Sequence, residues 1–237
     1  MATLQQIAIR TIKAFAIDTS GLPKSIIKNI RTCCDPANSL EDRGKSACRN
    51  KHFDCFVSLV ASNPKNILLS HYAAAYGNLD CLQYAHENGC PWDENTSAYA
   101  AQNGHLDCLQ YAHENGCYWD ERVAACAAEK GHLDCLQYAH ENGCPWATET
   151  TTYAAWSGNL DCLRYAREKG CPWNEDTITY DAACCNKLDC LRYVHKNGCP
   201  WNVYTTACAA QRGHLDCLRY AHENGCCLLY TSDAADE

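Results

Sequence analysis

Apolar and polar positions follow a helical period through most of the chain. In the segment GHLDCLQYAHENGC (residues 104–117), the two leucines and the tyrosine mark the apolar face of a helix, and Gly116 supplies a left-handed stop. Upstream, Asp93 can cap an earlier helix that ends near Gly104. The pattern therefore predicts two short helices per segment. Because a helix of about ten residues is marginal alone in water, neighbouring helices must hold each one.

The segment recurs at a fixed spacing. The same fourteen letters stand at 131–144, and again at 213–226 with Arg219 in place of glutamine. The Leu-Asp-Cys motif recurs at intervals of 27, 27, 27, 28 and 27 residues, and its signature cysteines are Cys81, Cys108, Cys135, Cys162, Cys190 and Cys217. A weaker copy at 47–63 has Lys51 where the other copies have glycine. A constant period in this range predicts a solenoid, here of seven units.

The repeated unit carries a family resemblance. The stretch AAQNGHLDCLQYAHENG (residues 100–116) resembles the ankyrin pattern A-A-x-x-G-H-L-E-V-V-x-x-L-L-x-x-G. Ankyrin units usually have about 33 residues, and the missing residues fall between Gly89 and Ala100, where the family places a β-hairpin finger. The resemblance covers about three quarters of the chain. It implies an all-α, right-handed solenoid of ankyrin-like helix-turn-helix repeats without β-hairpin fingers, over residues 36–226.

Cysteine is abundant, with 21 residues in a chain of 237. In the ankyrin pattern, Cys81 and its equivalents replace a buried valine, and buried free cysteine behaves as a small apolar side chain. Because Cys81 and His86 point in different directions on a helix, we expect no metal site. The N-terminus has no apolar signal segment and the chain no stretch of 18 apolar residues. We therefore expect reduced thiols, no membrane partner and a cytoplasmic location, with the nucleus as the alternative.

No motif of an enzyme is present in the sequence. It contains no G-x-x-x-x-G-K loop, no G-x-S-x-G elbow and no H-E-x-x-H pair, so we expect no catalytic residues, no cofactor and no enzymatic activity. A net charge of −8 and a pI near 5.6 disfavour nucleic acid as a partner. What remains is recognition of another protein.

Residues that differ between repeats are the candidates for that recognition, because the shared positions build the core. In the ankyrin pattern, the two residues after Ala-Ala face the concave side. From these pairs we expect partner contacts by Tyr76, Gln102, Asn103, Glu129, Lys130, Trp156, Ser157, Gln211 and Arg212. The same position pair in the sixth unit is Cys184-Cys185. Drift on a solvated face is the alternative explanation of this variation.

Two residue types recur near the end of each unit. Five tryptophans recur shortly after the cysteine that closes a unit, and we expect them to be structural and buried in the shared core: Trp92, Trp119, Trp146, Trp173 and Trp201. Histidines stand where ankyrins usually have leucine, and we expect packing roles for His86, His113, His140, His195 and His222, with a pH-sensitive stack as the alternative. Trp156 breaks this period, so we expect its side chain to be exposed and to anchor a partner.

The N-terminal segment, residues 1–35, lacks the repeat. In TLQQIAIRTI, Leu4, Ala8 and Ile12 form one apolar stripe, and Leu22-Pro23 interrupts the helical pattern. This layout resembles a SOCS box, which binds elongin and a cullin, and the start of an F-box. The resemblance implies an adaptor site in a cullin-RING ubiquitin ligase. The alternative is a cap that covers the first repeat.

The last eleven residues, CLLYTSDAADE (227–237), break the pattern where Pro-Trp should follow Cys226. They are identical to one reading frame of a common transposase-derived sequencing adapter. We therefore expect this tail not to be native and exclude it from the fold.

Overall fold

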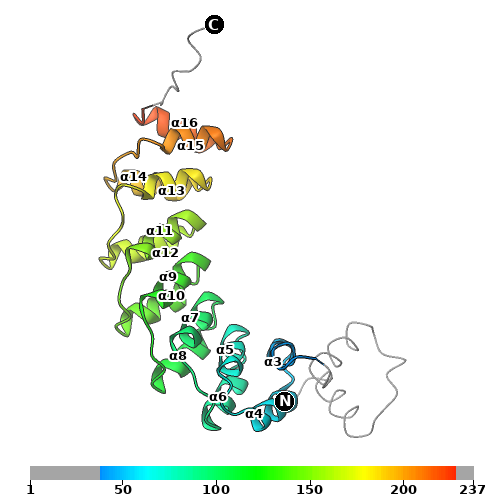
Figure 1. Ribbon diagram of the computed structural model, residues 1–237. Helices are drawn as coiled ribbons and strands as arrows, with labels where there is room; N and C mark the ends of the chain where they lie inside the picture. Colours follow the sequence, from blue (N-terminus) through cyan, green and yellow to red (C-terminus); the bar gives the residue numbers. More distant parts are fainter. Residues whose placement is uncertain (1–37, 228–237) are drawn as a thin grey trace. The chain divides into compact units, whose positions relative to one another are not determined.

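The computed structural model describes residues 38–227, and within this range the chain is helical and has no strand (Figure 1). Fourteen helices follow one another in pairs over these residues. The pairs are α3 (Leu40–Arg49) with α4 (Phe53–Ser62), α5 (Ile67–Ala75) with α6 (Leu79–Glu87), α7 (Glu94–Gln102) with α8 (Leu106–Glu114), α9 (Glu121–Lys130) with α10 (Leu133–Glu141), α11 (Thr148–Ser157) with α12 (Leu160–Glu168), α13 (Ile178–Cys184) with α14 (Leu188–Lys196), and α15 (Thr205–Gln211) with α16 (Leu215–Glu223). The predicted all-α stack of paired helices is confirmed.

The chain forms two compact units. The first extends to Ala100 and includes Asp107–Tyr118, and the second comprises Ala101–Leu106 and the chain from Trp119 onward. In the first unit, α3 packs on α5 and α4 packs on α6. In the second unit, one row is α9, α11, α13 and α15, and the other is α10, α12, α14 and α16. Helices thus contact their neighbours along the row, as in a solenoid.

Caps and left-handed residues set the ends of the helices. At the start of α9 the Asp120 carboxylate accepts the backbone N–H of Arg122, and at its end Gly131 adopts a φ of 80°. Two other pairs make the same left-handed turn with a residue other than glycine. Lys51 has a φ of 54° there, and Asn186 has a φ of 58°. Asparagine tolerates this conformation better than lysine does. The weakest copy of the repeat therefore keeps the turn at a conformational cost.

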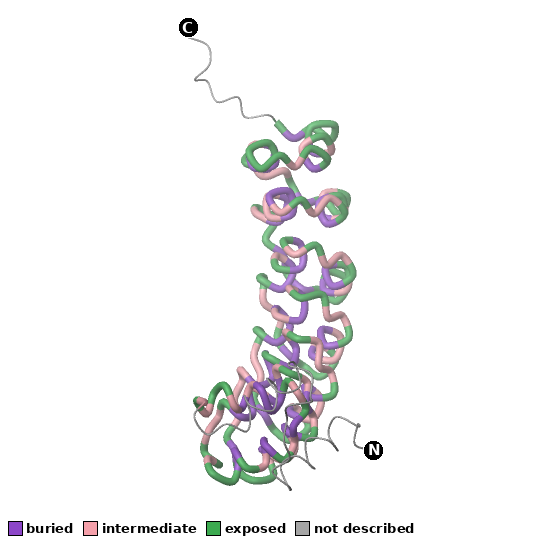
Figure 2. The backbone as a smooth tube through the Cα atoms, turned by 90° about the vertical axis from the view of Figure 1, so that its right-hand side faces the viewer, coloured by how far each residue is buried: buried purple, intermediate pink, exposed green. Residues whose placement is uncertain are grey.

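Small and aliphatic side chains fill the core of each pair, and Figure 2 shows buried positions recurring on successive helices. Five leucines that follow the signature cysteines are fully buried: Leu82, Leu109, Leu136, Leu163 and Leu191. The signature cysteines are buried beside them. Burial raises the pKa of Cys108 and Cys190 to about 12. These thiols therefore stay protonated at neutral pH and pack as small apolar groups.

The cysteines that close each unit have a second role. We call Cys90, Cys117, Cys144, Cys171, Cys199 and Cys226 the turn cysteines. The Cys117 Sγ donates to the backbone oxygen of Asp93 at 3.2 Å, and the Cys144 Sγ donates to that of Asp120 at 3.2 Å. Each of these bonds joins the end of one repeat to the start of its own first helix. The turn cysteines thus satisfy backbone groups as well as filling space.

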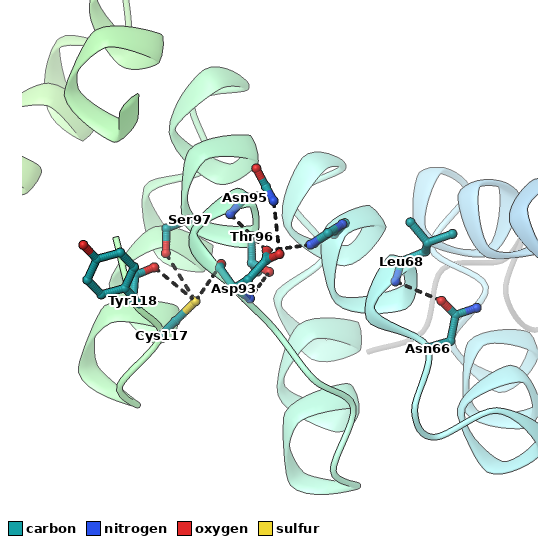
Figure 3. A network of polar contacts seen from close by, with 9 residues as sticks. Asn66, Leu68, Asp93, Asn95, Thr96, Ser97, Cys117 and Tyr118 are labelled. Atoms are coloured by element: carbon teal, nitrogen blue, oxygen red, sulfur yellow. Dashed lines mark hydrogen bonds and ion pairs between the residues drawn. The ribbon is translucent and has the colours of Figure 1, made fainter. Parts of the chain in front are cut away.

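A polar network around Asp93 joins two repeats of the first unit (Figure 3). The Asp93 carboxylate accepts the backbone N–H of Asn95 at 3.0 Å and pairs with the His71 Nε2 of α5 at 2.8 Å. Burial of the carboxyl opposes its ionisation, but the hydrogen bonds from His71 and Asn95 outweigh burial and hold the pKa of Asp93 below its usual value. The network fixes the start of α7 against α5.

The repeated histidines pack against the repeated tryptophans. In the first unit, the His86 ring stacks on Trp92 with centroids 3.9 Å apart, and its Nδ1 lies 3.0 Å from the Tyr111 hydroxyl of the next repeat. Equivalent stacks in the second unit are His140 on Trp146 at 4.7 Å and His195 on Trp201 at 4.3 Å. These three histidines have the predicted packing role. His222 in the last described pair is exposed.

The period-keeping tryptophans are less enclosed than the sequence predicts. Trp173 is buried, with the Arg167 guanidinium 4.0 Å from its ring centre. The other four are half-buried: Trp92, Trp119, Trp146 and Trp201. Each of these tryptophans lies in the loop after the second helix of its pair. The rings therefore cover the edge of the helix stack and do not lie within it.

Candidate protein-interaction surface

The predicted partner residues stand at the ends of first helices. Tyr76, in the first unit, caps the end of α5 and is 37% exposed. The others all belong to the second unit, at or just after the ends of α7, α9, α11 and α15. We call these eight residues the partner face: Gln102, Asn103, Glu129, Lys130, Trp156, Ser157, Gln211 and Arg212.

Trp156 is the most prominent aromatic residue of the partner face. Its side chain is 48% exposed, and Tyr153, one turn earlier on α11, is 39% exposed. The Trp156 side chain lies near the Cys185 thiol. Burial raises the pKa of the Cys185 thiol, although the positive charges of Arg212 and Lys187 act in the opposite direction. The indole ring of Trp156 thus remains accessible to a partner.

The charged members of the partner face are partly engaged within the chain. The Lys130 Nζ lies 2.9 Å from Glu129, an exposed pair that adds little stability. The Arg212 guanidinium donates to the backbone oxygen of Cys184 at 3.2 Å, across two neighbouring repeats. Gln102 and Ser157 are half-buried, whereas Asn103 and Gln211 are exposed. The structure therefore offers an exposed ring with a fixed cation on the same row of first helices.

Side chains after two of the first helices link successive repeats next to this row. The Asn159 amide donates to the backbone oxygens of Ala128 at 2.9 Å and Glu129 at 2.7 Å. His214 Nδ1 lies 3.0 Å from the backbone oxygen of Ala183. These bonds satisfy carbonyls at the ends of α9 and α13. The ends of the first helices are thereby held in place, which positions the partner face.

One disulfide overturns the expectation that the thiols are all reduced. Cys184 of α13 and Cys208 of α15 are bonded, with Cα atoms 5.4 Å apart. Neither is a signature or turn cysteine, so the repeat did not reveal the pair. Cys184 stands at a position that the other repeats fill with other residue types, and Cys208 shares its repeat position with Cys126 alone. The sequence did not predict the bond, because a single sequence does not show which positions of neighbouring repeats lie in contact.

Neither a metal-binding cluster nor a helix suited to span a membrane occurs among the described residues. Within residues 38–227, no group of three or more His, Cys, Asp or Glu side chains is arranged to hold a metal ion. In that same range no helix is both long and apolar enough to cross a bilayer.

The predicted adaptor residues, Leu4, Ala8, Ile12, Leu22 and Pro23, lie outside the described residues. So does the predicted non-native tail, apart from its first residue, Cys227. The Cys227 carbonyl accepts the Thr206 hydroxyl at 2.8 Å, as the Pro172 carbonyl accepts that of Thr151 at 3.1 Å. The backbone at Cys227 thus continues a contact of the repeat.

Comparison with known proteins agrees with this geometry. Residues 70–113 match a family model of ankyrin repeats in many copies, and residues 97–177 match one of three ankyrin repeats. Residues 70–177 therefore consist of ankyrin repeats. A solved structure similar to it is the crystal structure of the human ASB11 ankyrin repeat domain, at 19% identity and a TM-score of 0.57. The match covers 68% of this chain and 85% of that one. The search of curated proteins found no significant match.

Proposed function

We propose that this protein is a non-enzymatic interaction module that binds a protein through the partner face. Ankyrin repeats typically serve protein–protein interaction, and the specific surface is our inference from the differences between repeats. One observation carries it: Trp156 is 48% exposed at a position that other repeats fill with Gln102, Glu129 or Gln211. Tryptophan is enriched among residues that dominate binding energy.

The surroundings of Trp156 also suit recognition. Covering an exposed indole in a complex is favourable, because removal of apolar surface from water is stabilising. Tyr153 extends the aromatic surface along α11, and Arg212 adds a cation whose position is fixed by the Cys184 carbonyl. Rigid aromatic and arginine side chains lose little entropy on binding. Drift on a solvated face would not require such a cluster of hot-spot types.

Photo-crosslinking tests the proposal directly. A photoreactive phenylalanine analogue at position 156 should capture a specific protein from extracts of the source cell. The same analogue at Tyr118, an aromatic in the loop after α8 that is 69% exposed, is the matched control. With the captured protein purified, Trp156→Ala should weaken binding by about tenfold or more. Equal capture from position 118, or unchanged affinity in Trp156→Ala, would refute the partner face.

An adaptor function in a cullin-RING ubiquitin ligase remains the second candidate, from the apolar stripe of Leu4, Ala8 and Ile12 alone. It predicts that the intact chain binds elongin and that Leu4→Asp abolishes binding while the melting temperature is unchanged. Trp156→Ala should keep elongin binding, because the two sites are separate in sequence. The absence of elongin or other cullin-adaptor binding would leave the interaction module as the only function proposed.

A further inference from the structure

Four cysteines of the second unit lie on the first helices of their pairs or directly after them. They are Cys126 of α9, Cys184 and Cys185 of α13, and Cys208 of α15. The signature and turn cysteines, by contrast, recur in nearly every repeat and are explained by packing. The four are not explained by the repeat, so a different role must account for them.

The position of each cysteine in its repeat places it beside the partner face. Cys184 occupies the position that Trp156 and Gln211 fill in neighbouring repeats, and Cys208 occupies the position of Tyr153. Because α13 packs on α15, these two positions meet between adjacent repeats. The Cα separation of 5.4 Å lies within the range that a disulfide spans without backbone movement. The fold therefore brings the two cysteines within disulfide range.

We propose that Cys184 and Cys208 form a reversible redox modification site that fixes the partner face of the last two described repeats. The part of the proposal that concerns binding rests on the function proposed above. Contacts of the Cys184 segment connect the disulfide to the partner face. The Arg212 guanidinium donates to the backbone oxygen of Cys184 at 3.2 Å, and α11, which carries Trp156, packs on α13. Arg212 is thus attached to the segment that the disulfide holds, and Trp156 lies on the helix that packs against this segment.

The exchange chemistry needs only a dithiol and its disulfide. A thiolate of the dithiol attacks one sulfur of the Cys184–Cys208 bond, the other sulfur leaves as a thiolate and takes a proton, and the second thiol of the reagent completes the exchange. Two electrons and two protons pass to the protein, and the reagent becomes a disulfide. The reverse reaction restores the bond. Exchange requires local opening, because Cys184 is only 4% exposed and Cys208 only 6%.

Peptide mass spectrometry tests the site without any partner. The full chain is equilibrated with oxidised or reduced dithiothreitol, denatured in acid and alkylated without further reduction. We expect the oxidised sample to contain a Cys184–Cys208 cross-linked peptide that the reduced sample lacks. Cys126→Ser, which alters the free thiol at the position equivalent to Cys208, should keep the cross-link. Complete alkylation of Cys184 and Cys208 in the oxidised sample would overturn the proposal.

Hydrogen exchange tests the consequence for the fold. Amides of α13 and α15 should exchange at least several-fold more slowly in the oxidised chain than in the reduced one, while those of α9 and α11 should change little. Cys208→Ser should exchange like the reduced chain in both conditions. Equal exchange in the two redox states of the natural sequence would show that the bond fixes nothing.

The effect on binding is separable from the function itself. For a partner captured at position 156, the affinity should differ several-fold between the oxidised and reduced chain, and the difference should vanish in Cys208→Ser. If Trp156→Ala weakens binding but oxidation does not alter it, the partner face stands and the redox control is wrong. If no partner is captured, the cross-link and exchange measurements still decide whether the modification site exists.

Discussion

The two helices of each repeat are under different constraints. The second helices and the loops after them carry the same residues from repeat to repeat, and these make the same contacts, as in the stacks of His140 on Trp146 and His195 on Trp201. The ends of the first helices carry a different pair of residues in each repeat, and there the exposed Trp156 and the Cys184–Cys208 bond occur. Repetition therefore marks the packing contacts, and we expect the residues that interrupt it to serve recognition and control.

The largest expected effect concerns the repeated cysteines. Burial raises the pKa of Cys108 and Cys190 to about 12 and that of Cys144 to about 11. A thiol whose pKa is higher in the folded than in the unfolded state contributes its full stabilisation below about pH 8.5. This stabilisation is lost as the pH rises toward the folded pKa. Ionisation of each such thiol in the unfolded chain should therefore lower the free energy of unfolding by about 2 kcal/mol between pH 8 and pH 10. Urea unfolding in a reducing buffer at both values measures the loss.

The matched control for this prediction is Cys108→Ala. Its unfolding free energy at pH 8 falls because a buried side chain is truncated, but its further decrease up to pH 10 should be about 2 kcal/mol smaller than in the natural sequence. A decrease of the same size in both chains would mean that the Cys108 thiol does not contribute, and the packing role of the signature cysteines would need revision.

A smaller effect compares the glycines that end the two helices of one repeat. Gly158 after α11 has a φ of 87°, and an added Cβ would meet the Lys187 side chain at 2.6 Å. Gly170 after α12 has a φ of 81° and open space around it. Both alanine variants should lose about 1 kcal/mol from left-handed strain, and Gly158→Ala should lose more. Urea midpoints measure the difference. In a Lys187→Ala background the two costs should become equal, and a persistent difference would contradict this account.

The smallest effect is a gain in stability at the least regular repeat. Lys51 adopts a φ of 54° in the turn between α3 and α4, where the other repeats have glycine or asparagine. Lys51→Gly should raise the unfolding free energy by up to about 1 kcal/mol, because glycine enters this conformation without strain. Asn186→Gly should gain less, since asparagine already tolerates it. Thermal melting separates the two variants, and a loss of stability in Lys51→Gly would show that the lysine side chain makes a contact of greater value.

The sequence predicts this fold well because the same local signals for helix starts and stops recur in each repeat. Period, caps and glycine stops together predict the paired helices, and the weak copy around Lys51 follows the same turn. The contacts between repeats are harder to predict. The Cys184–Cys208 bond and the His71–Asp93 pair join residues 24 and 22 positions apart, and their formation depends on how neighbouring repeats are packed. The half-burial of Trp146 was missed for a related reason, since periodicity shows that a position is shared but not how deeply it lies.

The central claim is that repeated residues stabilise the fold while Trp156 is free to bind, and a paired substitution tests it most directly. Trp146→Ala removes a half-buried ring stacked on His140, and should lower the unfolding free energy by about 2 to 3 kcal/mol, somewhat less than for a fully buried tryptophan. Trp156→Ala removes a ring that is 48% exposed, and should change it by no more than about 0.5 kcal/mol. Urea unfolding of the two variants beside the natural sequence gives both numbers. A loss in Trp156→Ala as large as that in Trp146→Ala would show that Trp156 is a packing residue and would contradict the account.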